Sequence, residues 1–271
     1  MLTRLAPTSV RATIVATLAA CSLVVPSRTF AQQPAPPTAT PAVQAGAGKE
    51  EGNFFKSLAV NLGDDVKHMP RMNSLYWLAA GSGLALAVHP ADDSLNQHLA
   101  GDFADKFFAP GKVIGSFPFV LGTSVTTYLV GRIGGHPRGK HLGMDLIEAT
   151  LLSEGITQAI KYSVRRERPI EPDGSQASGY AFPSGHATVT FAAATVLQQH
   201  LGWKAAVPTY LVATYVAISR LHDYRHFASD VAFGAGDGII IGRSVTWHGR
   251  NFYGTPVVGP GKVGMMFSVQ P

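Results

Sequence analysis

Two histidines and one carboxylate in the second half of the chain have the residue types and the spacing of a reactive group. His226 and Asp230 are four residues apart, so on a helix they would share one face. The Asp230 carboxylate could then accept the proton of one ring nitrogen of His226 and leave the other nitrogen as a nucleophile. His186 follows Ser184 and Gly185 at the start of a run that predicts a helix. Backbone N–H groups at a helix start favour an anion, and Gly185 lets that backbone come close to it.

Three cations accompany these residues. Lys161 is followed after six residues by Arg168, and Arg220 lies six residues before His226. Positive side chains can hold the oxygens of an anion, and a guanidinium can do so with two parallel hydrogen bonds. The whole set is suited to a phosphate-like anion.

The helices between these residues have the lengths needed to bring them together. Residues 187–201 and 205–219 are two helix-length runs, separated by Gly202-Trp203-Lys204. At ~1.5 Å per residue each spans roughly 22 Å, so the chain returns to its starting level at Arg220. His226 would open a further helix at that level, and Lys161 would close the helix before. We therefore expect all of these side chains to meet at one end of a helical bundle.

The same residues form three motifs in a fixed order. They read K-x(6)-R-P from Lys161, P-S-G-H from Pro183 and S-R-x(5)-H-x(3)-D from Ser219. This signature resembles that of the type 2 phosphatidic acid phosphatase family, whose superfamily also holds bacterial class A acid phosphatases and vanadium haloperoxidases. The match covers about a quarter of the chain, and every signature position carries the expected residue.

The resemblance implies a mechanism for each position. His226 would attack phosphorus and form a phosphohistidine, with Asp230 orienting its ring. His186 would protonate the departing oxygen and then activate water. The transition state would be held by Lys161, Arg168, Ser184, Gly185 and Arg220. These cations supply the positive charge, so the resemblance implies no metal and no cofactor, and it predicts an acid phosphatase or phosphatidate phosphatase-like hydrolase.

Two other functions stay open at this point. A vanadium-dependent haloperoxidase would use the same residues to hold vanadate, although such enzymes tend to be considerably longer. A non-catalytic envelope scaffold is the third interpretation, but a scaffold does not require three cations beside two histidines.

Other polar residues are better explained without chemistry. Arg165 and Arg166 occupy no signature position, and we interpret them as a solvated loop face or as contacts to a substrate headgroup. Residues 170–182 join two motifs and must lie beside the site, which suggests a lid or a specificity role. The remaining histidines are interpreted as packed or surface side chains: His68, His89, His98, His136, His141, His200, His222 and His248.

Composition restricts the partners of the chain. Apolar residues make up 46% of the 271 residues and charged residues only 14%, against about 25% in an ordinary soluble domain. A net charge of +5 suits an anionic substrate or an anionic lipid surface. No dense Lys/Arg tract or nucleic-acid motif is present, so we expect no nucleic-acid partner.

The chain divides into three parts. Residues 1–31 have the basic start and apolar stretch of a secretory signal peptide, with cleavage expected after Ala31. Lipidation at Cys21, the only cysteine, is the alternative. Residues 32–50 are rich in Pro and Ala and predict a disordered linker. We assign residues 51–271 to the phosphatase domain.

Within that domain the sequence predicts an all-α fold. We expect a bundle of about six core helices with the active site at one end. Gly234, Gly238 and Gly242, spaced by four, predict close helix packing. The tail around Thr255 and Lys262 suggests a short C-terminal β-hairpin, without a function. Helical patterns occupy residues 53–69, 72–88, 113–131, 142–164, 187–201, 205–219 and 229–245.

The location and the substrate are predicted less sharply. The leader favours export to a bacterial periplasm or cell envelope, with an integral membrane protein as the alternative. Only 72–88 and 113–131 approach the ~20 apolar residues of a spanning helix. A phosphorylated small molecule or lipid is the expected partner, with lipid or isoprenoid phosphates and pyrophosphates favoured.

Overall fold

The computed structural model describes residues 54–99, 102–246, 252–259 and 262–269. The expected leader, linker and domain start near Glu51 lie outside these residues. The helices are α2 (Phe54–His68), α3 (Met72–Val88), η1 (His89–Ala91, a 3₁₀ turn), α4 (Asp92–His98), α5 (Asp102–Ile114), α6 (Phe117–Ile133), α7 (Pro137–Val164), α8 (Gly185–Leu201), α9 (Trp203–His222) and α10 (Ala228–Val245). The strands are β1 (Phe252–Gly259) and β2 (Lys262–Val269).

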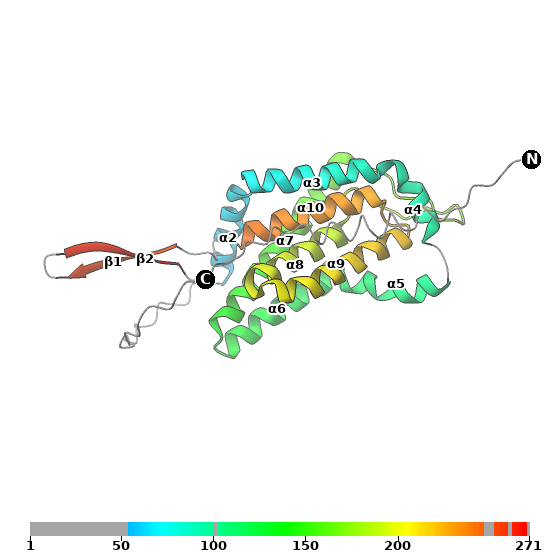
Figure 1. Cartoon of the computed structure of the whole chain (residues 1–271). Coiled ribbons are helices and arrows are strands. Elements are labelled where there is room, and N and C mark those ends of the chain that lie inside the picture. Colours follow the sequence, from blue (N-terminus) through cyan, green and yellow to red (C-terminus); the bar gives the residue numbers. More distant parts are fainter. Residues whose placement is uncertain (1–53, 100–101, 247–251, 260–261, 270–271) are drawn as a thin grey trace, which may run out of the picture. The chain divides into compact units, whose positions relative to one another are not determined.

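Six of the described helices, α3 and α6 to α10, have 17 residues or more and form the bundle. The expected all-α fold is therefore confirmed (Figure 1). Helix α10 packs against α3, α7 and α8, and nearly all of its side chains are buried. It is the central helix of the described bundle.

Glycines allow α10 to approach its neighbours. A Cβ on Gly234 would lie 2.8 Å from the carbonyl oxygen of Ser184, and one on Gly242 would lie 2.6 Å from that of Ala192. A Cβ on Gly238 would collide with the carbonyl of Thr188. The glycines spaced by four on α10 therefore face residues spaced by four on α8 and its N-cap, which confirms the predicted close packing.

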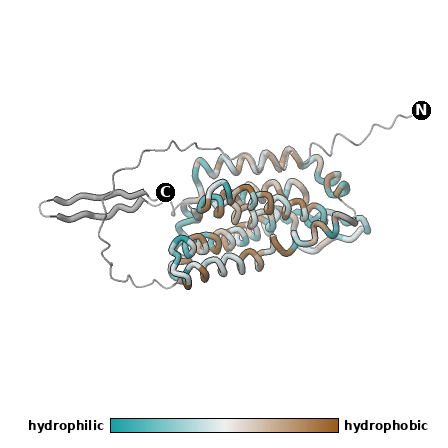
Figure 2. The backbone as a smooth tube through the Cα atoms, turned by 60° about the horizontal axis from the view of Figure 1, so that its bottom comes forward, coloured by the Kyte–Doolittle hydropathy of each residue, from teal (hydrophilic) through white to brown (hydrophobic). Residues whose placement is uncertain are grey.

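The apolar core lies where α7, α8 and α10 meet. Leu146, Ala192, Val196 and Ile241 are among its buried members. Leu146 and Ala192 lie near the middle of their helices, whereas Ile241 lies four residues from the end of α10. Hydrophobic and neutral backbone positions run along the helix middles, and hydrophilic ones gather toward the ends (Figure 2).

The uncharged run at 113–131 is not one helix, contrary to expectation. Helix α5 ends at Ile114, and α6 begins at Phe117 after Ser116. Pro118 lacks a backbone N–H and fits best in the first turn of a helix, which favours a helix start here. A Cβ on Gly115 would collide with Val216 of α9, so this α5–α6 elbow packs tightly on the bundle. Helices α4 and α5 were not predicted from the sequence.

Other boundaries differ by a few residues. Helix α6 extends to Ile133 and α7 begins at Pro137, which shortens the basic loop expected at 131–139. Helix α7 ends where Arg165 takes a left-handed conformation with φ 54°. The predicted hairpin is confirmed: β1 and β2 are antiparallel, with Phe252 opposite Val269 and Gly259 opposite Lys262.

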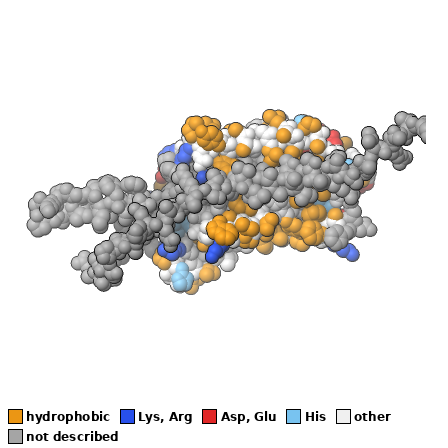
Figure 3. Space-filling view, viewed as in Figure 1, with side chains coloured by type: hydrophobic (Ala, Val, Ile, Leu, Met, Phe, Trp, Pro, Cys, Tyr) orange, Lys and Arg blue, Asp and Glu red, His pale blue; other side chains and the backbone are white. Residues whose placement is uncertain are grey.

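Large apolar side chains are exposed on the outer helices. Examples are Leu86 of α3 (74% exposed), Ile133 of α6 (83%) and Leu211 of α9 (61%). Hydrophobic side chains cover much of the visible described surface, including the edge along α3 (Figure 3). No single helix in the described part of the chain is long and apolar enough to cross a bilayer. Helices α5 and α6 together have the required length and composition, but the chain bends by 54° at the break between them.

Candidate active site

Four segments that carry the motif residues meet at one end of the bundle. They are the end of α7, the start of α8, the end of α9 and the start of α10 (Figure 1). The backbone N–H of Ser184 donates to the carbonyl of Asp230 at 3.1 Å, which joins the second motif to the third. Lys161 Nζ donates to the carbonyl of Tyr180 at 2.6 Å, which joins the first motif to the segment before the second. The convergence expected from the helix lengths is therefore present.

The ring of His226 is held by a backbone carbonyl. Its Nδ1 lies 2.6 Å from the carbonyl oxygen of Ala181 and 3.8 Å from Oδ2 of Asp230. The Asp230 carboxylate is thus an ion-pair neighbour of the ring, but the nearest acceptor is the Ala181 carbonyl and not the predicted Asp230. Because a carbonyl oxygen can only accept, Nδ1 carries the proton and Nε2 keeps its lone pair. The expectation that one ring nitrogen is protonated and the other free fits this contact, although the sequence analysis did not say which nitrogen carries the proton.

His226 also lies outside the helix that was expected to carry it. Helix α10 begins at Ala228 with Phe227 as its N-cap. Asp230 is in the first turn, where its Oδ2 accepts the backbone N–H of Phe227 at 2.8 Å. The helix start therefore competes for the oxygen that sequence reasoning assigned to the histidine.

A tight turn places Arg220 and His226 together. The backbone N–H groups of Arg225 and His226 both donate to the carbonyl of Arg220, at 3.1 and 3.3 Å. Tyr224 takes a left-handed conformation with φ 51°, which folds the chain back on α9. Burial is the largest cause that lowers the pKa of Arg168 and of Arg220, and the charge of Arg225 lowers both further. Arg225, which the sequence analysis did not single out, therefore adds to the positive charge of the site.

The predicted cations differ in how far they are already engaged. Arg220 donates to Asp223 Oδ2 at 2.7 Å and to Ser219 Oγ at 3.1 Å. Burial, followed by the charge of Arg168, lowers the pKa of Lys161 to about 8. Repulsion between neighbouring cations is what a bound anion would relieve.

Several buried donors have no hydrogen-bond partner among the described residues, and two of them come from the motifs: Nε of Arg168 and Oγ of Ser184. A buried polar group without a partner costs free energy, so such groups are rare unless a ligand or water satisfies them. Both belong to the predicted phosphate-binding set, and both fit an acceptor such as a phosphate oxygen.

Both predicted catalytic histidines have a lowered pKa. Burial lowers the pKa of His226 to about 4, and the positive charges of Lys161 and Arg168 add to this against the opposing effect of Asp230. Burial, followed by the charge of Arg220, lowers the pKa of His186 to about 4. The charge of His226 contributes to the latter shift, so the two rings lie within electrostatic range of each other. At neutral pH and without an anion, both rings are uncharged.

The α5–α6 elbow covers His186. Its Nε2 lies 3.1 Å from the carbonyl oxygen of Lys112, and a Cβ on Gly115 would lie 2.9 Å from its Cδ2. A carbonyl accepts only, so Nε2 carries a proton in this contact. Nδ1 of His186 has no hydrogen-bond partner among the described residues. Gly185 lies beside the methyl group of Thr157, which a Cβ would meet at 3.3 Å.

The segment between the first two motifs forms a wall. The carbonyl of Ala181 binds His226, and the N–H of Ala181 donates to the carbonyl of Arg166 at 2.8 Å. A hollow of about 610 Å³ lies against this segment, and Lys161 and Arg168 line it with Tyr162 and Tyr180. The lid or specificity role of residues 170–182 stays a prediction.

Arg166 is not the solvated residue that sequence reasoning suggested. It donates to Asp230 Oδ1 at 2.8 Å and to Asp92 Oδ2 at 2.8 Å. Its position inside a basic run gave no sign of these partners, because the two acids lie 64 and 74 residues away in sequence. Asp92 was missed for the same reason.

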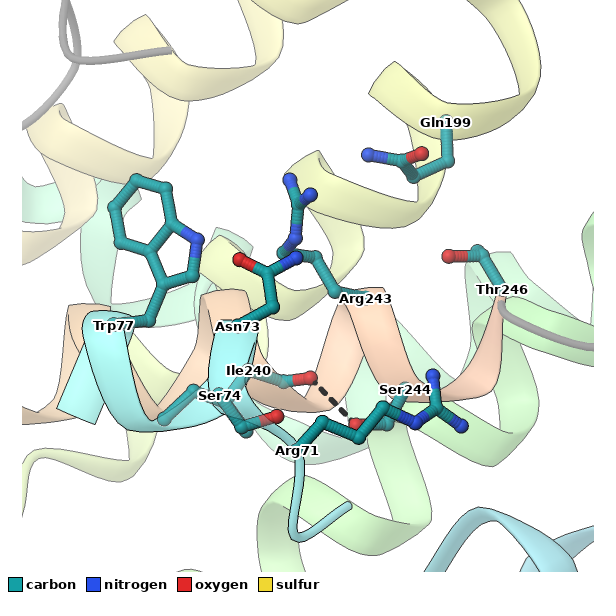
Figure 4. Close-up of a pocket in the computed structure, with 9 residues that line it drawn as sticks. All are labelled: Arg71, Asn73, Ser74, Trp77, Gln199, Ile240, Arg243, Ser244 and Thr246. Carbon is teal, nitrogen blue, oxygen red and sulfur yellow. Dashed lines mark hydrogen bonds between the residues drawn. The ribbon is translucent and has the colours of Figure 1, made fainter. Parts of the chain in front are cut away.

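No group of three or more His, Cys, Asp or Glu residues in the described part of the chain could hold a metal ion. A second, smaller hollow of about 70 Å³ lies among Arg71, Trp77, Arg243 and Thr246 (Figure 4). It is formed by the start of α3 and the end of α10, at the end of these helices away from the motif residues.

Comparison with known proteins agrees with this geometry. Residues 142–253 match the model of the PAP2 superfamily. The lipid A 1-phosphatase of Porphyromonas gingivalis is 40% identical over 112 residues, which cover 40% of this chain and 24% of that protein. The decaprenylphosphoryl-5-phosphoribose phosphatase of Mycolicibacterium smegmatis is 42% identical over 87 residues, 31% of this chain and 47% of that protein. The chain thus spans a quarter to a half of the length of these relatives.

A solved structure shares the fold. The transmembrane PAP2-type phosphatidylglycerolphosphate phosphatase of Bacillus subtilis superposes with a TM-score of 0.53 over 68% of this chain and 94% of that chain. At 19% identity this similarity concerns the fold alone. All three motifs lie inside residues 142–253, the part of the chain that matches the PAP2 superfamily model, so the resemblance read from them is confirmed.

Proposed function

We propose that this domain is a phosphatase that hydrolyses phosphate monoesters through a phosphohistidine at His226. The observation that carries the proposal is the arrangement around that ring: Nδ1 is fixed by the Ala181 carbonyl, which leaves the Nε2 lone pair as the nucleophile. Donors without partners on Arg168 and Ser184 lie in the same predicted set and fit the phosphate oxygens.

The first step forms the Nε2–P bond of His226 and breaks the bond between phosphorus and the leaving oxygen. The electron pair of that bond leaves with the oxygen, which takes a proton from the His186 imidazolium. The imidazolium carries a proton on each ring nitrogen, so Nδ1 can donate to the leaving oxygen while Nε2 stays on the Lys112 carbonyl. A bound phosphate dianion raises the pKa of His186 and so supplies the protonated form.

The second step restores the free enzyme. His186, now neutral, accepts a proton from water, whose oxygen attacks phosphorus as the N–P bond breaks and the electron pair returns to His226. The products are inorganic phosphate and an alcohol. Lys161, Arg168 and Arg220 neutralise charge on the oxygens in both steps, and no divalent metal enters this scheme.

We infer that the substrate is a phosphorylated lipid or isoprenoid, met at a membrane. The exposed apolar side chains of α3, α6 and α9 suit contact with lipid. The names of the relatives, a lipid A phosphatase and a decaprenylphosphoryl-phosphoribose phosphatase, favour this class. Export with cleavage after Ala31 is part of the same proposal, because it would place the site outside the cytoplasm.

The test compares wild-type protein with a His226→Ala variant. Wild type should release phosphate from phosphatidate, undecaprenyl pyrophosphate or a soluble monoester in EDTA, and vanadate should inhibit it. The variant should lose turnover by at least about 10³-fold while it unfolds at the wild-type temperature. Activity that requires an added metal, or a variant with near-normal turnover, would contradict the scheme. The ranking of the three substrates identifies the preferred class.

A further inference from the structure

Arg166 and Asp92 form a bridge behind the presumed nucleophile, and neither residue belongs to the three motifs. One guanidinium nitrogen of Arg166 donates to Asp230 Oδ1 at 2.8 Å, and the other donates to Asp92 Oδ2 at 2.8 Å. The side chains of Asp230 and Asp92 are 0% and 5% exposed, and that of Arg166 is 24% exposed. Such a nearly dry, charge-assisted bridge fixes direction as well as distance.

Asp92 also holds the start of α10 directly. Its Oδ1 accepts the backbone N–H of Ser229 at 2.9 Å, and its Oδ2 accepts the Ser229 hydroxyl at 2.6 Å. The first N–H groups of a helix have no partner inside that helix, so Asp92 satisfies one that would otherwise be buried and unpaired. The same Ser229 hydroxyl is 2.7 Å from Arg166, which closes the network.

The carboxylate of Asp230 is held in place by a hydrogen bond to each of its two oxygens. Oδ1 accepts from Arg166, and Oδ2 accepts from the N–H of Phe227 and lies 3.8 Å from Nδ1 of His226. The guanidinium of Arg166 lies 4.2 Å above the ring of Phe227, the residue that follows His226. Arg166 therefore braces both the carboxylate and the backbone beside the histidine.

We propose that Arg166 and Asp92 are positioning residues for catalysis, which hold Asp230 and the start of α10 so that His226 presents Nε2 to phosphorus. Asp92 comes from α4, outside the residues that match the family model, and thus adds a further segment to the site. Neither residue needs to touch the substrate. This inference rests on the phosphatase activity proposed above.

The decisive variant is Arg166→Ala, with Arg165→Ala as its matched control. Arg165 is the adjacent arginine, but its side chain is exposed and donates only to the carbonyl of Tyr162. In Arg166→Ala the kcat should fall by about 100-fold, the cost of a misplaced reacting group, while KM changes by less than about twofold. Guanidinium ion at millimolar concentration should restore part of the lost kcat. Arg165→Ala should keep both constants within about twofold of wild type.

A second variant covers the case in which Arg166→Ala does not fold. Asp92→Asn keeps the shape and removes the charge and one acceptor of the bridge, and it should lower kcat in the same direction, with KM unchanged. A raised KM at unchanged kcat would make Arg166 a substrate contact and overturn the inference, as would wild-type kcat in both folded variants. Wild-type protein without any phosphatase activity would instead reject the proposed function itself.

Discussion

At the residue scale, the site gathers positive charge around two uncharged rings. Lys161 and both histidines have lowered pKa values, and burial is the largest cause in each case. Such shifts concentrate at functional sites because they cost stability and need a reason to persist. With the proposed function, a bound anion supplies that reason, because its charge would offset the repulsion among Arg168, Arg220 and their neighbours.

The two histidines predict the pH dependence of kcat/KM. Attack requires neutral His226 and departure requires protonated His186, and both pKa values are about 4. The singly protonated pair is most populated near pH 4 and becomes rarer as pH rises. We therefore expect kcat/KM to have an acid optimum and to fall between about pH 5 and 7, with a His186→Asn variant losing this dependence. An optimum at or above pH 7 would contradict the assignment.

Stability must be measured at each pH in that experiment. Folding lowers the pKa of both histidines from the ordinary histidine value of 6.5. As pH falls below 6.5, the unfolded chain therefore binds more protons than the folded protein does. The folded state is therefore destabilised by acid, with the loss complete below about pH 4. A decline in activity at low pH counts toward the mechanism only while the protein remains folded.

At the element scale, the glycines of α10 set how closely the motif helices approach. Gly234 faces the carbonyl of Ser184, the residue that caps α8 in the phosphate-binding set. Gly236 faces Gly81 of α3, where a Cβ would lie 2.8 Å from Cα. The distance between α8 and α10, and with it the distance between His186 and His226, depends on the absence of side chains at these positions.

Gly238→Ala tests this dependence. Its Cβ would collide with the Thr188 carbonyl, so the helices must separate, at a cost of about 1–3 kcal/mol. We expect the midpoint of thermal unfolding to drop by several degrees and kcat to fall. The control is Gly155→Ala on α7, which has nothing within 4 Å and should stabilise the helix slightly. Equal unfolding temperatures for Gly238→Ala and wild type would refute the packing argument.

At the scale of the whole molecule, exposed apolar surface and positive charge could both contribute to membrane binding. The net charge is +5 for the full chain and +2 after cleavage at Ala31, because the leader carries Arg4, Arg11 and Arg28. This positive charge would attract an anionic surface, and salt screens such attraction. Exposed side chains such as Leu86, Ile133 and Leu211 would bury apolar area in lipid, which salt does not weaken. The two contributions can therefore be separated by ionic strength.

The expressed protein should stay with the membrane fraction in 1 M NaCl and be released by mild detergent, because apolar burial dominates. A Cys21→Ser variant should behave in the same way, which separates this contact from lipidation at Cys21. Release by salt alone would show that charge holds the protein. Loss of membrane binding in Cys21→Ser would assign it to a lipid anchor.

The sequence by itself determined the motifs, the all-α fold and the end of the bundle at which the site lies, since residue types and helix lengths carry that information. It did not determine what holds the reactive ring. The Ala181 carbonyl is 45 residues from His226, and Asp92 is 137 residues from Ser229. A backbone carbonyl leaves no side-chain signature, and the competition of Phe227 and Arg166 for Asp230 exists only once distant segments are packed. Only the tertiary structure decides which of several possible acceptors lies closest.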